Sequence, residues 1–235
     1  MANKEDVVNY FSAIAQRYDL VNHVLSFNCD RRWRKRLVRL SGIRSGQSLI
    51  DLCTGTGDIL MAMHRYCPGC KLTGLDLTEP MLELARTKLD RLGADVTLLP
   101  GDAVQVPVDD GAFDIVTMGF GLRNLEDPLR GLQEIARILK PGGKALILEF
   151  APAPKGWFGA MYHFYLRFII PMLGGLITGS KQAYRHLSTS IQGFFEPDHF
   201  VQSMGTVGFD RVEAMPLSGG IAYIYQGTRL GLTAT

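Results

Sequence analysis

The chain has 235 residues, and 46% of them are hydrophobic. A chain of this length and composition can bury the core of one enzyme-sized domain without help from disulfides or metal ions. The formal net charge of +2 excludes a chain-wide electrostatic attraction to nucleic acid, so we expect no nucleic-acid partner. The N-terminal residues carry neither the apolar region of a secretory signal nor the pattern of a transit peptide, which predicts a cytoplasmic location.

Helical and strand patterns alternate along the chain, which predicts an α/β fold with a mostly parallel, seven-stranded sheet and helices on both faces. Strands are predicted at 48–53, 71–77, 95–100, 113–118, 144–150, 211–215 and 221–227. Helices are predicted at 3–18, 30–40, from the first strand to 66, 80–92, 128–139 and 197–207, with a Lys-Pro-Gly-Gly stop signal at 140–143. We expect residues 1–235 to form a single domain, with 1–45 as a helical cap and 152–195 as an apolar insert.

The second predicted helix is strongly basic and also carries Trp33. Such a helix face is usually a solvated one, but basic residues beside an aromatic ring can also contact anionic lipid headgroups. The basic residues are Arg31, Arg32, Arg34, Lys35, Arg36 and Arg39.

The stretch from Leu49 to Asp58 is typical of a nucleotide-binding turn, because an apolar strand runs directly into a glycine-rich turn that opens a helix. Gly55 and Gly57 let the backbone approach a ligand and present N–H groups at the start of the helix. Position 60 is leucine rather than the third glycine of the dinucleotide fingerprint. The turn therefore predicts a nucleoside smaller than a dinucleotide.

Two further acids follow strands of the same predicted sheet. Asp76 ends the second strand about 20 residues beyond the turn, where an acid can accept hydrogen bonds from ribose hydroxyls. Asp102 and Ala103 follow the third strand, where a carboxylate and a backbone N–H can read an adenine edge. Asp51 lies in the first strand and can either fix the turn or meet the ammonium of S-adenosylmethionine. This series favours S-adenosylmethionine over NAD.

The four cysteines are expected to be thiols in the cytoplasm. Cys67 and Cys70 flank a Pro-Gly turn and, with His64, have a spacing that also suits a zinc site or a redox pair. Because the chain has no second pair at this spacing, we expect an ordinary turn and no metal.

Residues 156–180 are rich in aromatic residues and methionine. The uncharged run from Phe168 to Ser180 is shorter than the roughly 20 residues that span a bilayer, and His163, Arg167 and Pro171 interrupt the segment. Two interpretations stay open: a buried crossover helix, or an apolar lid over a lipophilic substrate.

Nearly the whole chain resembles the ubiquinone and menaquinone biosynthesis C-methyltransferases. The most specific motif is Phe-Gly-Leu-Arg-Asn at 120–124, and the others are Tyr18-Asp19 with Asn22, Trp33, the turn at 51–58, Leu-Lys-Pro-Gly-Gly at 139–143 and Leu-Glu-Phe at 148–150. The resemblance implies a class I S-adenosylmethionine-dependent methyltransferase fold, similar to the Rossmann fold. It also implies C-methylation of a polyprenyl quinol, either the naphthoquinol of menaquinone or the benzoquinol of ubiquinone biosynthesis.

The resemblance and the strand ends together predict a set of site residues. The cofactor contacts are Asp51, Thr54, Gly55, Thr56, Gly57, Asp76, Leu77, Asp102, Ala103 and Gly119, although some relatives have serine at the position of Gly119. The substrate contacts are Tyr18, Phe120 and Tyr184. The catalytic residues are Arg123 and Asn124, which would hold a water or stabilise a phenolate, with Asp102 as their acceptor partner.

The general base is left open, because an arginine keeps its proton. Alternative bases are His23, His163, His186 and His199, each of which also suits a structural role. Two other functions compete with the leading one: methylation of another hydrophobic small molecule, and a non-catalytic scaffold that binds S-adenosylmethionine. The expected partners are the lipophilic quinol, the inner face of the membrane as a peripheral contact, and a second copy in a homodimer.

Overall fold

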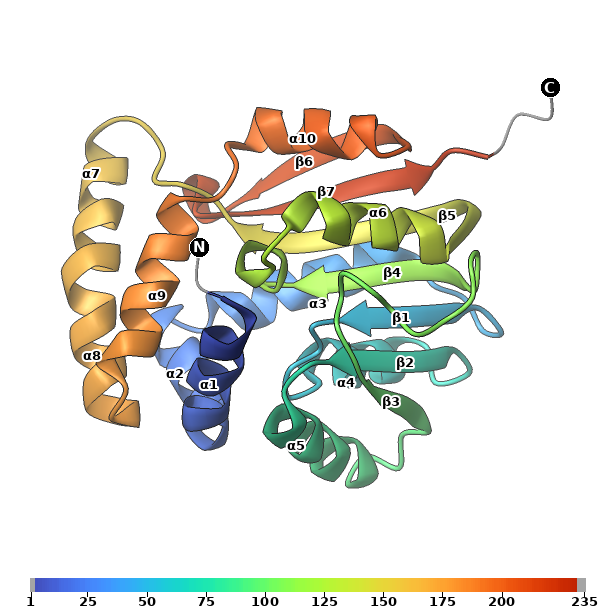
Figure 1. Ribbon diagram of the computed structural model, residues 1–235, viewed down its shortest axis with the longest axis horizontal. Helices are drawn as coiled ribbons and strands as arrows, with labels where there is room; N and C mark the ends of the chain where they lie inside the picture. Colours follow the sequence, from blue (N-terminus) through green and yellow to red (C-terminus); the bar gives the residue numbers. More distant parts are fainter. Residues whose placement is uncertain (1–2, 232–235) are drawn as a thin grey trace.

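The computed structural model describes residues 3–231, and its centre is a seven-stranded sheet in the order β3-β2-β1-β4-β5-β7-β6 (Figure 1). Strands β1 to β5 are parallel, and β7 runs antiparallel between β5 and β6. This confirms the predicted mostly parallel sheet. The strands are β1 (Ser48–Leu52), β2 (Lys71–Asp76), β3 (Val96–Pro100), β4 (Phe113–Gly119), β5 (Leu139–Phe150), β6 (Phe209–Leu217) and β7 (Ala222–Arg229).

Helices cover both faces of the sheet because successive strand residues point to opposite sides. Leu49 belongs to the cluster under α3, α4 and α5, whereas the next residue, Ile50, belongs to the cluster under α6 and α10. The helices on the first face are α3 (Cys29–Ser41), α4 (Asp58–Tyr66) and α5 (Glu79–Asp90), and those on the second face are α6 (Pro128–Ile138) and α10 (Pro197–Thr206).

A third apolar cluster forms a cap at the carboxyl ends of the parallel strands, on the left of Figure 1. Within it, Tyr184 packs so closely on α8 that a Cβ at Gly174 would lie 2.4 Å from its ring. The cap consists of α1 (Lys4–Ile14), α2 (Tyr18–Leu25), α7 (Trp157–Phe164), the π-helical turn η3 (Tyr165–Ile169), α8 (Ile170–Thr178) and α9 (Lys181–Gln192). Segments far apart in the sequence, before β1 and after β5, therefore build one structure.

The cap departs from the expected elements in two places. The single helix predicted at 3–18 is interrupted by a 3-10 turn, η1 (Ala15–Arg17), after which α2 begins at Tyr18. The turn redirects the chain, so Ile14 and Val21 both reach the cap cluster. The helix α9 was not predicted, although Ala183, Leu187 and Ile191 recur at helical spacing within it.

Two turns also differ from expectation. The stop signal at 140–143 does end α6, but the backbone continues as β5 from Leu139, with an irregularity opposite Phe113 and Ile115. Cys67 and Cys70 form a disulfide rather than the expected thiols, because the Pro-Gly turn brings their Cα atoms to 5.6 Å. Both sulfur atoms are therefore bonded to each other, and Cys67 and Cys70 do not form the alternative zinc site with His64.

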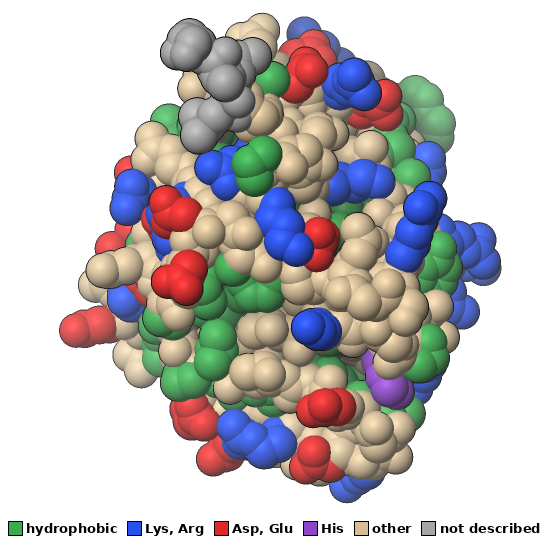
Figure 2. Space-filling model, turned by 90° about the vertical axis from the view of Figure 1, so that its right-hand side faces the viewer, with side chains coloured by type: hydrophobic (Ala, Val, Ile, Leu, Met, Phe, Trp, Pro, Cys, Tyr) green, Lys and Arg blue, Asp and Glu red, His purple; other side chains and the backbone are tan. Residues whose placement is uncertain are grey.

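The end of the molecule opposite the cap carries charges of both signs. Figure 2 shows this end, where Lys and Arg side chains are interspersed with Asp and Glu rather than gathered in one field. The two cavities described below lie at the other, capped end.

Candidate active site

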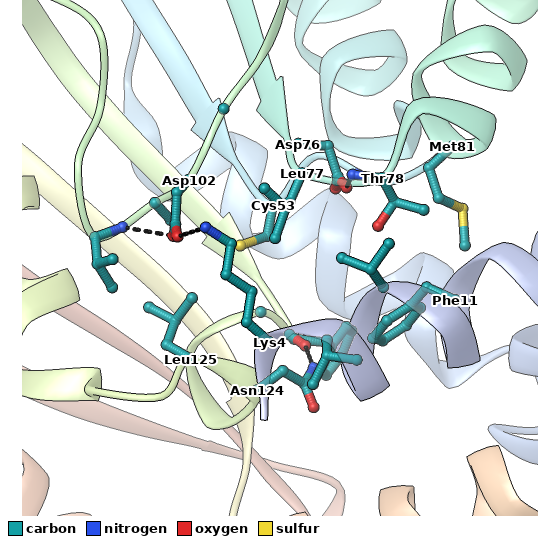
Figure 3. A pocket seen from close by; sticks show the side chains of 18 of the residues that line it. Lys4, Phe11, Cys53, Asp76, Leu77, Thr78, Met81, Asp102, Asn124 and Leu125 are labelled. Carbon is teal, nitrogen blue, oxygen red and sulfur yellow. Dashed lines mark hydrogen bonds and ion pairs between the residues drawn. The ribbon is translucent and has the colours of Figure 1, made fainter. Parts of the chain in front are cut away.

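Two cavities adjoin at the carboxyl ends of the parallel strands, beneath the cap. The first cavity lies between the ends of β1 to β4 and the helix α1, as Figure 3 shows. Residues from four separate strand ends therefore meet in one place. Of the predicted cofactor contacts, those that line this cavity are Gly55, Asp76, Leu77, Asp102, Ala103 and Gly119.

Asp76 ends β2, and two backbone donors fix its carboxylate. The N–H of Gly55 donates to Oδ2 and the N–H of Thr78 donates to Oδ1, each at 2.8 Å. Burial raises the pKa of Asp76, although these hydrogen bonds oppose the shift. Each carboxylate oxygen keeps a further lone pair, so Asp76 can still accept hydroxyl hydrogens from a ligand.

Asp102 lies on another wall of the cavity and meets the start of α1 (Figure 3). Its Oδ1 accepts the N–H of Val104 at 3.1 Å, and its Oδ2 lies 2.6 Å from Nζ of Lys4. The backbone N–H of Lys4 donates to Glu126 Oε1 at 2.7 Å. The first turn of α1 is therefore tied across this cavity at two points.

The other predicted cofactor residues lie behind the glycine turn rather than on the wall: Asp51, Thr54, Thr56 and Gly57. Asp51 accepts the hydroxyl of Thr54 at 2.7 Å and that of Thr117 at 2.6 Å. Of the two roles left open for Asp51, this geometry supports fixing the turn. Gly57 has φ of +80°, and a Cβ there would lie 3.2 Å from that of Ala85.

Thr56 joins the glycine turn to the cap. Its hydroxyl donates to Asp19 Oδ1 at 2.6 Å and accepts from Nζ of Lys88 at 2.9 Å. Lys88 also lies 2.5 Å from Asp19 and 2.9 Å from Asp58. We call Asp19, Thr56, Asp58 and Lys88 the turn clamp, since they connect α2, the turn, α4 and α5.

The end of β4 forces an unusual backbone at the boundary between the cavities. Phe120 has φ of +59°, a left-handed conformation that costs of order 1–3 kcal/mol in a residue with a side chain. Its neighbour Gly121 leaves no room for a side chain, because a Cβ would lie 2.5 Å from that of Cys53. At Gly119 a Cβ would lie 2.6 Å from Ile59, so the serine of some relatives would require Ile59 to move.

The second cavity has a volume of about 370 Å³ and is mainly apolar, with many aromatic side chains in its walls. All three predicted substrate residues line it: Tyr18, Phe120 and Tyr184. Other walls come from Trp33, Phe150 and Tyr162. The residues that line both cavities are Phe11, Tyr18, Phe120 and Asn124, and we call this set the junction.

Arg123 is buried beside the junction and pairs with Glu149, the acid near the end of β5. Its Nη1 lies 2.7 Å from Glu149 Oε1 and also donates to the carbonyl of Phe120. The predicted partnership with Asp102 is wrong, because Asp102 pairs with Lys4 instead. A cation buried in an apolar wall requires a nearby negative charge, and the Glu149 carboxylate on β5 provides it.

Asn124, the next residue along the chain, belongs to the junction itself. Its Nδ2 donates to the Phe120 carbonyl at 3.2 Å, and its Oδ1 lies 3.1 Å from Nε2 of His186 on α9. Of the histidines proposed as bases, only His186 lines either cavity among the described residues. His23 instead pairs with Asp30 at 2.7 Å.

Several site residues were not predicted as such. Glu149 and Phe150 belong to one of the motifs that carry the family resemblance, but neither was predicted as a site residue. The signal that could have identified Glu149 is an acidic residue inside an otherwise apolar strand. Lys4, Met81 and Tyr162 carry no local signal, because only the packing of the cap brings them to the cavities.

The buried Asp51 makes stability depend on pH. Burial raises its pKa to about 7, although the hydrogen bonds from Thr117 and Thr54 lower it. The folded state therefore holds a proton that the unfolded chain, with a pKa of about 4, has released, and this stabilising contribution is lost as pH rises to about 7. We expect the free energy of unfolding of Asp51→Asn, relative to wild type, to increase with pH across this window. Urea denaturation at several pH values measures it, and a difference independent of pH contradicts the assignment.

The Arg123–Glu149 pair is expected to be worth far more than an exposed pair. Glu149→Gln leaves a buried cation without its counter-charge and should lower the free energy of unfolding by about 3–5 kcal/mol. Asp110→Asn breaks the exposed contact with Arg137 and should cost less than about 1 kcal/mol. Urea denaturation of both variants checks this, and equal losses would contradict the buried pair's role.

Comparison with known proteins agrees with this architecture. The chain matches the model of the ubiE/COQ5 methyltransferase family over residues 1–229. It is 44% identical to a demethylmenaquinone methyltransferase of Thermus thermophilus, with 93% of this chain and 99% of that protein covered. It is 40% identical to the ubiquinone/menaquinone biosynthesis C-methyltransferase UbiE of Bdellovibrio bacteriovorus, with 96% and 97% covered.

Solved structures share the fold at lower identity. A SAM-dependent methyltransferase from Thermotoga maritima superposes with a TM-score of 0.67 at 20% identity, covering 94% of this chain and 99% of that one. The fold is thus the class I, Rossmann-like fold of S-adenosylmethionine-dependent methyltransferases. With the family match over almost its whole length, the chain belongs to the ubiE/COQ5 methyltransferase family.

Proposed function

We propose that this chain transfers a methyl group from S-adenosylmethionine to a ring carbon of a polyprenyl quinol. The observation that carries the proposal is the junction, where a cavity lined by Asp76 and Asp102 adjoins an aromatic cavity of about 370 Å³. A polar nucleoside and a lipophilic ring can thus approach each other across one shared set of side chains. The names of the relatives, demethylmenaquinone methyltransferase among them, fit this pair of ligands.

The residues of the first cavity fit S-adenosylmethionine. The Asp76 carboxylate, held by two backbone N–H groups, suits the ribose hydroxyls. Leu77 and Met81 provide apolar surface for an adenine ring, and Asp102 lies within the same cavity. When bound, the cofactor supplies a methyl group on a positively charged sulfur, already activated for transfer.

The residues of the second cavity suit an anionic transition state. Arg123 keeps its proton, and its Nη2 makes no hydrogen bond to any described residue, so it is available to a phenolate oxygen. The aromatic walls exclude water and hold the ring in line with the methyl group. These roles of Arg123 and Asn124 are consistent with their position beside the junction.

A direct assay tests the function. Labelled S-adenosylmethionine is supplied with reduced demethylmenaquinol and, separately, with a benzoquinol precursor, each with long and short tails. We expect label in the naphthoquinol, since the Thermus relative is named for that ring. Label only in a phenol or sterol would support the alternative substrate class, and cofactor binding without transfer to any acceptor would support the non-catalytic scaffold.

Asp76→Ala isolates the cofactor site. The variant lacks the carboxylate that the N–H groups of Gly55 and Thr78 hold in place. It should show no measurable binding of S-adenosylmethionine in calorimetry and therefore no methyl transfer. The matched control is Asp110→Asn, which changes an exposed acid far from both cavities and should bind normally. Wild-type affinity in Asp76→Ala would contradict the assignment of the first cavity.

We also propose that the cap contacts the membrane surface. The outer side of the helical segment 157–178 exposes Trp157, Met161, Phe164, Phe168, Met172 and Leu176. Met161 also lines the second cavity, as does the exposed Phe27, so the apolar surface is continuous with a route into that cavity. A quinol with a prenyl tail can pass along such a route without crossing water.

The helical segment 157–178 is long and apolar enough to cross a bilayer. This differs from the sequence-based expectation, which considered only the shorter uncharged run from Phe168 to Ser180. Its inner side nevertheless packs in the cap through Tyr162, Leu166 and Ile170. A helix held to the protein along one side fits a position on the bilayer surface better than one across it.

A triple variant tests the membrane contact. Trp157→Ser, Phe164→Ser and Phe168→Ser together should abolish co-sedimentation with anionic vesicles while preserving methylation of a short-tailed quinol in detergent. Exposed serines cost little stability, so circular dichroism should remain native. The same face is instead the interface of a homodimer if the wild-type protein does not bind vesicles and is dimeric, while the triple variant is monomeric.

A further inference from the structure

His186 occupies a position that the reaction can use. It lies on α9, lines the second cavity and bonds through Nε2 to Asn124, a member of the junction. Its ring is also 5.5 Å from that of Tyr10 on α1, so the cap holds it from two sides.

The hydrogen-bond network fixes the tautomer of this histidine. The carbonyl of Phe120 can only accept, so the Asn124 amide must direct its NH₂ group toward it and its Oδ1 toward His186. Oδ1 also only accepts, so Nε2 of His186 carries a hydrogen. In a neutral ring Nδ1 is then unprotonated, and no described residue forms a hydrogen bond with it.

The surroundings keep the ring neutral. Burial and then the Arg123 guanidinium lower the pKa of His186, whereas Asp6 on α1 acts in the opposite direction. Other polar groups of the cavity are poorer acceptors of a proton. Burial raises the pKa of Tyr184 to about 12, and Asp30 is already paired with Arg34 and His23.

We propose that Nδ1 of His186 is the general base that takes the hydroxyl proton of the quinol, with Asn124 as the positioning residue that sets the tautomer. This inference rests on the proposed function and names a residue for it. The electron pair of the broken O–H bond stays on oxygen as a phenolate, next to the Arg123 cation. The phenolate increases the electron density on the ring carbon and makes that carbon more nucleophilic.

The remaining steps balance. The ring carbon forms its bond to the methyl carbon while the carbon–sulfur bond breaks, and that bond's electron pair stays on sulfur. The ring carbon then loses its hydrogen as a proton to water, which restores the aromatic ring. The phenolate oxygen takes back the proton held by His186, so one proton in total reaches solvent and the histidine is neutral again.

His186→Gln is the sharpest variant, because glutamine can still donate to Asn124 Oδ1 but cannot take up a proton. We expect kcat to fall by about 100-fold or more, with little change in the KM of the quinol or in the calorimetric affinity for S-adenosylmethionine. The fall of kcat at low pH, which reports protonation of the base, should be absent in His186→Gln. Added imidazole should partly restore the turnover of a second variant, His186→Ala. The matched control His199→Gln changes a histidine that packs on Phe195 and should keep wild-type kcat.

A readout independent of turnover accompanies these assays. Nitrogen-15 NMR compares wild type with His186→Gln, and the signal that the variant loses should come from a ring with protonated Nε2 and bare Nδ1. Full kcat in His186→Gln, a loss confined to KM, or the opposite tautomer overturns the proposal while leaving the proposed function intact. Absence of transfer by wild type to any quinol overturns both.

Discussion

The buried ion pair between Arg123 and Glu149 is the interaction on which the site depends. Glu149 comes from β5, a strand inside the sheet, so its carboxylate is fixed by the core rather than by a loop. Arg123 can therefore occupy an apolar wall, and its Nη1 also holds the carbonyl of Phe120. Asn124 shares that carbonyl and in turn bonds His186. One charge pair in the core thus orders a series of groups that ends in the second cavity.

The same pair explains how a strained residue is tolerated. Phe120 is left-handed, and its ring stacks on Phe150 at 4.5 Å between centroids. The Arg123 guanidinium lies 5.4 Å from the centroid of the Phe150 ring. These contacts, together with the two hydrogen bonds to its carbonyl, over-determine a conformation that would otherwise relax. The strain places one aromatic ring on both cavities, which is where a donor and an acceptor must meet.

Much of the sheet and the first cavity could be predicted from the sequence, because the relevant signals are local. Asp76 and Asp102 each end a short apolar strand, and parallel topology brings such strand ends to one edge. The sequence could not say which side of the turn each residue faces. Asp51 and Thr56 were both predicted as cofactor contacts, and in the structure Asp51 bonds Thr54 whereas Thr56 bonds Asp19 of the cap.

The second cavity was harder to predict, because its walls come from both ends of the chain. Tyr18 precedes β1 and Tyr184 follows β5, and no periodicity relates them. Their position on one cavity depends on the 3-10 turn that separates α1 from α2 and on Gly174, which lets α9 pack on α8. The family resemblance pointed to Tyr18 and Tyr184, but only the packing of the cap gives them a common cavity.

The cap serves both ligands, and its two attachments to the sheet differ in strength. The turn clamp is half-buried around the buried Thr56, and it links Asp19 to Lys88 through that residue. The ion pair of Lys4 with Asp102 is partly exposed, and such pairs contribute only about 0–1 kcal/mol. The start of α1 is thus held by this pair and by the backbone N–H of Lys4 on Glu126, whereas α2 is held by a linked set of four polar groups.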